Sequence, residues 1–203
     1  MLGNSHYLDQ LRKYALTPST ASRTLAVDVG KVHRRARLAS HEDDDILRDM
    51  IEEATDELET EIGRALITRT YTLKLDRFPY GTDTIKLPVA PVRAITSIAY
   101  INSSGTTVTW SSSLYQVDAS QEPGRIYPAY NQDWPDIRSC SDDLNSVTIT
   151  FTAGYGSCPD DIPPMARKAI TSKVVSDYTG CEEDTRNQMN AWRNAVNLLK
   201  WGE

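Results

Sequence analysis

Residues 42–79 read EDDDILRDMIEEATDELETEIGRALITRTYTLKLDRFP, and the spacing of their apolar residues changes near Gly63. Up to that glycine, apolar residues recur three and four positions apart, which is the pattern of a helix with one buried face. The acidic residues 43–45 favour the N-terminus of this helix because they complement its dipole, and Gly63 suits its C-terminus. The apolar stripe comprises Ile46, Leu47, Met50, Ile51, Ala54, Leu58 and Ile62.

Beyond Gly63 the apolar period becomes two, which predicts strands. In the first strand, Leu73 and Leu75 alternate with polar residues. Further short strands are separated by glycine or proline, and Asn102-Ser103-Ser104-Gly105 has the composition of a hairpin turn. Strands at this density favour an antiparallel sandwich or a small barrel. The later strands are predicted at 84–87, 95–101, 106–110, 115–118, 125–127 and 147–153.

Helices flank this β region on both sides. Asp28 can cap a short helix ahead of the acidic one. Prolines 163–164 suit the first turn of another helix, which would run to Gly180, and a last helix is predicted at about 184–201. In the N-terminal leader, the spacing of Tyr7, Leu8, Leu11 and Tyr14 suggests an amphipathic helix, followed by a linker at Pro18.

The predicted fold class is therefore α+β. A small helical bundle is formed by residues 24–66 and 160–203, which include the C-terminal helix. An inserted antiparallel module, sandwich-like or barrel-like, occupies residues 67–158. Residues 1–23 form a separate N-terminal extension.

The composition is that of an ordinary folded protein. Of the 203 residues 39% are hydrophobic and 25% are charged, so extended disorder is not expected. No apolar run approaches the roughly 18 residues of a membrane span, and the N-terminus lacks the pattern of a secretory signal. Three cysteines without a CxxC pair predict reduced thiols in a cytosolic protein, and neither a disulfide framework nor a zinc site.

Several phrases of the sequence resemble one protein family in their order. They are GRALI and DRFP within the opening stretch, then IKLPVAPVRAITSIAYINSSGT (85–106), YQVD (115–118), EPGRI (122–126), VTITFTAGYG (147–156) and DIPPMARKAI (161–170). The set resembles the head–tail connector group, also called head-completion or adaptor proteins, of tailed phages and related gene-transfer particles. The resemblance covers roughly residues 24–180.

This resemblance implies a structural virion protein and not an enzyme. It implies a ring of about twelve subunits between the portal protein and a tail-side stopper or tail protein. DNA would pass through the ring as cargo, no cofactor would be needed, and no membrane would be involved. The protein would be made in the host cytoplasm and would act in the neck of the particle.

The residues themselves predict no catalytic, cofactor or metal site. The three histidines are His6 in the leader, His33 on the first bundle helix and His41 in a turn, and no nucleophile elbow, phosphate loop or HExxH is present. Carboxylates at the consecutive positions 43–45 fan out by about 100° each on a helix, so they cannot converge on one ion unaided.

Charge is distributed unevenly along the chain. The net charge is −6, yet residues 42–61 hold eleven acidic side chains against Arg48 alone. A basic run precedes them on the neighbouring helix. Pairing of these two charged segments, within a subunit or between subunits, explains why both occur. Two alternatives stay open, namely that the acidic helix face is solvated or that it faces a DNA channel. The candidates for pairing are Arg34, Arg35, Arg37, Asp49, Glu53 and Glu57.

The C-terminal helix carries an apolar stripe that is widened by Leu198 near the chain end. Its residues are candidates for docking on the portal or on a neighbouring subunit, and removal of 184–203 is then expected to leave a stable fold. The alternative is that the stripe packs on its own bundle. The candidates are Met189, Trp192, Val196, Leu199 and Trp201.

Aromatic residues in the β region support a second functional hypothesis. Tyr130 and Trp134, in a polar loop, are candidates for exposed partner contacts. An open aromatic platform would instead indicate a β-sandwich module that binds carbohydrate, carried on a helical stalk. Electron microscopy with and without a portal distinguishes the connector from the sugar binder.

Overall fold

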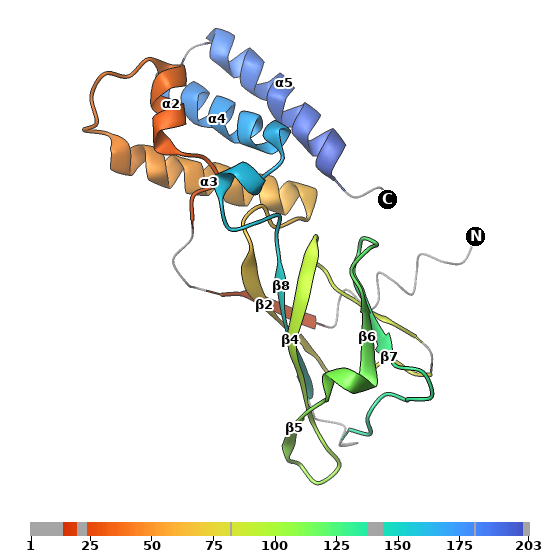
Figure 1. Ribbon diagram of the computed structural model, residues 1–203. Coiled ribbons are helices and arrows are strands. Elements are labelled where there is room, and N and C mark those ends of the chain that lie inside the picture. Colours follow the sequence, from red (N-terminus) through yellow and green to blue (C-terminus); the bar gives the residue numbers. More distant parts are fainter. Residues whose placement is uncertain (1–13, 20–23, 82, 138–143, 181, 201–203) are drawn as a thin grey trace. The chain divides into compact units, whose positions relative to one another are not determined.

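The computed structural model describes residues 14–19, 24–81, 83–137, 144–180 and 182–200 (Figure 1). The chain divides into two compact units. One contains Arg69–Ala153 together with the N-terminal residues as far as Thr20, and the other contains Ala21–Thr68 and Gly154–Glu203. None of the described helices combines the length and the hydropathy of a membrane-spanning segment.

The second unit is a helical bundle. Its helices are α2 (Val29–Ala36), α3 (Asp44–Ile62), α4 (Pro164–Thr179) and α5 (Glu182–Leu199). Helix α4 packs against each of the other three. Their apolar faces form one core, whose fully buried members include Val32, Leu47, Ile51, Leu58, Ile170 and Ala195.

Helix α3 confirms the prediction made from the opening stretch. It begins at Asp44 in the acidic run and is followed by Gly63, whose φ of 69° is left-handed and whose N–H donates to the Glu59 carbonyl. The buried stripe is narrower than the sequence pattern, because Ile46 points to solvent. The helix therefore depends on packing of one face, since its outer face is strongly acidic.

The buried carboxylate of Glu59 stabilises the segment that follows α3. Glu59 is buried, and its Oε1 accepts a hydrogen bond of 2.6 Å from the Leu66 N–H. Farther on, the Thr68 N–H donates to the Gly156 carbonyl. Gly154 has a φ of 138°, and a Cβ there would lie 2.5 Å from the Thr68 backbone, so only glycine fits. Residues 67–68 and 154–158, which were predicted to belong to the β module, lie in the helical unit.

The first unit contains two antiparallel sheets. The larger has the order β1-β2-β8-β4-β5, formed by β1 (Tyr14–Pro18), β2 (Arg69–Leu75), β8 (Val147–Ala153), β4 (Val92–Ile101) and β5 (Thr107–Thr109). The smaller has the order β3-β7-β6, formed by β3 (Ile85–Lys86), β7 (Arg125–Pro128) and β6 (Tyr115–Asp118). The α+β class is confirmed, and the described strands form no closed barrel.

Strand β8 is the middle strand of the larger sheet. It pairs with β2 on one side and with β4 on the other. Buried and half-buried residues alternate along its whole length, as the period of two predicted. The predicted turn also forms, because Asn102 Oδ1 accepts from the N–H groups of Ser104 and Thr106.

The N-terminal leader differs from the prediction. Tyr14 was expected to end a helix and Pro18 to lie in a linker, yet both belong to strand β1, which pairs with β2 in the register Tyr14–Leu75. The edge of β2 offers unpaired backbone groups that an extended segment can satisfy, and proline is tolerated at the end of an edge strand. The other residues of the expected helix, Tyr7, Leu8 and Leu11, lie outside the described residues.

The β6–β7 hairpin contains a pH-sensitive ion pair. Asp118 accepts hydrogen bonds from the Ser120 hydroxyl at 2.6 Å and from Arg125 at 2.7 Å. These bonds, first that of Ser120 and then that of Arg125, lower the pKa of Asp118 from 3.8 to about 2. Because the folded-state pKa is the lower one, the carboxylate stabilises the fold above pH 3.8, and this contribution disappears as the pH falls toward 2.

We expect Asp118→Asn to unfold at a lower denaturant concentration than the wild type at neutral pH, and the difference to shrink as the pH falls through this window. Denaturant titrations of both proteins at a series of pH values measure this difference in unfolding midpoint. The matched control is Asp133→Asn, which changes an exposed aspartate. A difference that stays constant down to pH 2 would show that the Asp118 carboxylate is not the stabilising group.

Candidate functional site

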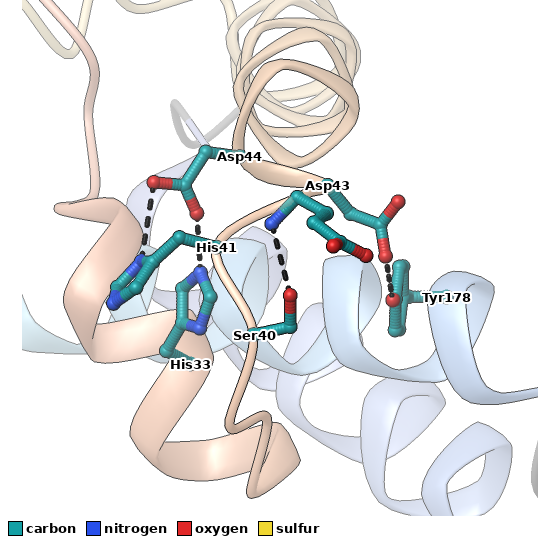
Figure 2. A network of polar contacts seen from close by, with 7 residues as sticks. His33, Ser40, His41, Asp43, Asp44 and Tyr178 are labelled. Atoms are coloured by element: carbon teal, nitrogen blue, oxygen red, sulfur yellow. Dashed lines mark hydrogen bonds and ion pairs between the residues drawn. The ribbon is translucent and has the colours of Figure 1, made fainter.

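The connection between α2 and α3 brings two histidines and one aspartate together. His33 lies on α2 and is only 6% exposed, whereas the side chain of His41, in the connection, is 77% exposed. Asp44 is the first residue of α3. The chain turns back between the helices, beginning at Arg37, whose φ of 56° is left-handed. This reversal places residues eleven positions apart side by side (Figure 2).

Asp44 contacts both histidines through different oxygens. His33 Nε2 lies 2.5 Å from Asp44 Oδ1, and His41 Nδ1 lies 3.3 Å from Asp44 Oδ2. The two imidazole rings lie with their centroids 4.6 Å apart. The hydrogen bond from His33 is the main cause that lowers the pKa of the Asp44 carboxyl. An ionised carboxylate is therefore held between two imidazoles.

Neighbouring polar contacts fix this connection in place. Asp43 Oδ2 accepts a hydrogen bond of 2.6 Å from the hydroxyl of Tyr178 on α4, and this bond raises the pKa of the tyrosine. Ser40 Oγ accepts from the N–H of Glu42 at 3.2 Å. The aspartates at the start of α3 thus have distinct partners, as Figure 2 shows. Neither Asp28 nor Asp43, at the N-caps of α2 and α3, makes a side-chain capping bond.

Donor atoms of His33, His41 and Asp44 all lie within 4.8 Å of one another, and such a group is able to hold a metal ion. No metal site was predicted from the sequence, because the chain contains no CxxC or HExxH and the consecutive aspartates 43–45 cannot converge on one ion. The missed signal was the pair of histidines eight positions apart, one near the end of a short helix and the other just before the next helix. That spacing alone does not show that the chain reverses between them.

The predicted pairing of charges within a subunit is not observed. Among the residues that the structure describes, no ion pair joins Arg34, Arg35 or Arg37 to the acidic candidates on α3, and all three arginines are exposed. Glu57 instead pairs with Lys173 on α4 at 3.2 Å. Ion pairs between exposed side chains gain little free energy in water, so exposed arginines need not pair with the nearest acidic helix. Pairing between subunits remains a prediction.

The apolar residues of α5 divide into two groups. Val196 is buried in the bundle core, and Trp192 and Leu199 pack against that core. The Trp192 indole N–H donates to Glu61 at 2.6 Å. Their packing supports the alternative that the stripe covers its own bundle, and docking through the exposed parts of Trp192 and Leu199 stays a prediction. Met189 is 51% and Leu198 68% exposed, while Trp201 lies outside the described residues.

The loop candidates also differ from each other. Tyr130 is 88% exposed, as predicted. Trp134 stacks on Phe78 with ring centroids 5.1 Å apart, contacts Trp110 and donates to the Asp83 carbonyl. Aromatic rings that pack on one another do not present the open platform that a carbohydrate module needs, so the structure does not favour that hypothesis.

Comparisons with known proteins point to one kind of particle. No protein-family model matches the sequence, and no curated protein matches it. A chain in the neck of an empty GTA particle, computed with C6 symmetry, matches at 21% identity and a TM-score of 0.69, over 89% of this chain and 94% of that chain. A chain in the virion of a native gene transfer agent (GTA) particle matches at 21% identity and a TM-score of 0.71, over 93% of this chain and 96% of that chain.

This chain has the fold of a neck protein. The neck of the native GTA particle, computed with C12 symmetry, contains a third match, at 21% identity and a TM-score of 0.67 over 89% of this chain and 94% of that chain. The neck-protein fold confirms the recognition that the ordered phrases between residues 24 and 180 supported. It also extends the likeness beyond those residues, because each match covers nearly the full length of both chains.

Proposed function

We propose that this protein is a structural subunit of the neck of a tailed phage or phage-like particle. It would form an adaptor ring that binds the portal protein on one side and a tail protein on the other, with DNA passing through. The observation that carries the proposal is the neck-protein fold, which is shared over at least 89% of this chain and 94% of the matched chains.

The symmetry of the matched particles supports a ring. Necks computed with C6 and C12 symmetry contain repeated copies of their chains, and a closed ring of identical subunits requires two different, complementary surfaces on each copy. Exposed arginines on α2 and exposed carboxylates on α3 supply charges of opposite sign. We propose that Arg34, Arg35 and Arg37 of one subunit face Asp49, Glu53 and Glu57 of the next.

Charge reversal tests this pairing. We expect Arg34→Glu with Arg35→Glu to weaken ring assembly, and to do so more strongly at low ionic strength, where repulsion between the new glutamates and α3 is least screened. Sedimentation or native mass spectrometry of portal-bound assemblies at several salt concentrations measures the effect. The control is Arg193→Glu, an exposed position on α5. Normal assembly of the double variant at low salt would show that these arginines are solvated.

Electron microscopy of the purified protein tests the function itself. The protein is expected to be a monomer or weak oligomer alone and to form a ring when portal assemblies are added. Native mass spectrometry at micromolar concentration defines the starting state. A tight dimer with a two-fold apolar interface would contradict the proposal, because a closed isologous contact cannot build a ring. Failure to bind portals from any tailed phage or gene transfer agent tested would leave the adaptor role without support.

A further inference from the structure

We infer that His33, His41 and Asp44 form a binding site for one divalent transition-metal ion of the zinc, cobalt or nickel class. The site lies within the helical unit and uses no residue of the proposed subunit pairing. It therefore stands apart from the neck role, and each can fail without the other.

The positions of the donor atoms carry this inference. Around a tetrahedral Zn²⁺ with bonds of about 2.0–2.1 Å, neighbouring ligand atoms lie roughly 3.3–3.5 Å apart. The Asp44 oxygens lie 2.5 Å from His33 Nε2 and 3.3 Å from His41 Nδ1, with all candidate donors within 4.8 Å. Side-chain rotations that widen the separation between His33 Nε2 and Asp44 Oδ1 would place the three donors around one ion, and the ion would replace the direct contact between these two atoms.

The kinds of donor select the class of metal. Two imidazole nitrogens with one carboxylate oxygen suit zinc and the neighbouring first-row ions, whereas calcium and magnesium prefer sets made of oxygen alone. Three protein ligands leave a fourth position for water or another ligand. The exposed side of His41 makes the group accessible to a metal ion from solution.

The surroundings hold the ligands before any metal arrives. The side chain of His33, on α2, is held by its burial in the bundle, and Asp44 is held by its place in the first turn of α3. The adjacent Asp43–Tyr178 hydrogen bond ties the start of α3 to α4. A bound ion would join the end of α2, the connection and the start of α3. It would thereby resist separation of the two helices, and the bundle would unfold at a higher temperature.

Metal titration of the untagged full-length protein tests the site. After dialysis against chelator, Zn²⁺ is added in isothermal titration calorimetry and native mass spectrometry, and Co²⁺ in visible absorption spectroscopy. We expect one ion per chain with a Kd on the order of 10 µM or tighter. Bound Co²⁺ should show the intense visible bands of a low-symmetry site with nitrogen ligands. Zn²⁺ should raise the unfolding temperature, while Mg²⁺ and Ca²⁺ should not.

Matched variants assign the binding to these side chains. His41→Ala removes an exposed ligand without opening the core, and Asp44→Asn removes the central carboxylate; each is expected to weaken binding by about tenfold or more. The controls are His6→Ala, which removes the third histidine of the chain, and Asp45→Asn, which removes the carboxylate next to Asp44 in the sequence. Both controls should bind as the wild type does. Circular dichroism verifies that every variant is folded.

Two outcomes would overturn the inference. The first is the absence of binding by the wild type at about 100 µM Zn²⁺. The second is binding that His41→Ala leaves intact or that His6→Ala abolishes. In either case His33, His41 and Asp44 stabilise the connection between α2 and α3 through hydrogen bonds, and they are not a metal site.

Discussion

A chain that ends at residue 183 is expected to lose the stable fold of its helical unit. Ala195 and Val196 are buried in the core, and Trp192 and Leu199 pack against it. Removing α5 exposes the faces of α3 and α4 that these side chains cover. The lost burial amounts to roughly 1.5–3 kcal/mol for each large apolar side chain, against a total stability of about 5–15 kcal/mol for a typical domain. This expectation reverses the one drawn from the sequence.

Thermal unfolding followed by far-ultraviolet circular dichroism measures this effect. The controls are Met189→Ser and Leu198→Ser, tested singly, since both side chains are exposed on α5. They lie nine positions apart, half a turn out of phase, so they are on opposite sides of the helix. Each should unfold near the wild-type temperature. A truncated chain as stable as the wild type would show that α5 contributes nothing to the bundle.

The Met189→Ser and Leu198→Ser variants also test the docking prediction for the two large apolar residues that are exposed on α5. If either Met189 or Leu198 contacts a portal or a neighbouring subunit, its variant will be folded but will join portal-containing assemblies poorly. Stable folding together with normal joining in both variants would place attachment on another surface.

Phe151→Ala is expected to destabilise the β unit by about 3–5 kcal/mol. Phe151 is fully buried on β8, the middle strand of the larger sheet, and its ring lies 5.6 Å from that of Tyr71 on β2. Truncation to alanine leaves a cavity between strands that are held on both sides, so the surroundings cannot collapse into it. The loss therefore includes both the transfer free energy of the ring and the cost of the cavity.

Denaturant unfolding followed by tryptophan fluorescence measures this change, because Trp110 and Trp134 belong to the aromatic cluster of the β unit. The control is Tyr130→Ala, at a highly exposed position, with an expected change within about 0.5 kcal/mol. Circular dichroism reports mainly on the helices and separates the two units if they unfold independently. A shift below about 1 kcal/mol for Phe151→Ala would show that β8 is not the centre of the core.

The elements whose signals are local could be predicted from the sequence alone. The limits of α3 follow from an apolar period, an acidic start and a glycine end, all within about twenty residues, and the structure reproduces them. Strands β6 and β8 have the predicted limits, because alternation and turn residues also act over a few positions. The α+β class and the likeness to neck proteins rest on these same local patterns in order.

The tertiary structure alone decided which surfaces meet. Tyr14–Pro18 became a strand because the edge of β2, more than fifty residues away, offers it backbone partners. Val196 belongs to the core because α3 and α4 cover it. His33 and Asp44 meet because the chain reverses between their helices. Periodicity shows that a face will be buried, but it does not identify the surface that buries it, because that surface comes from residues distant in the chain.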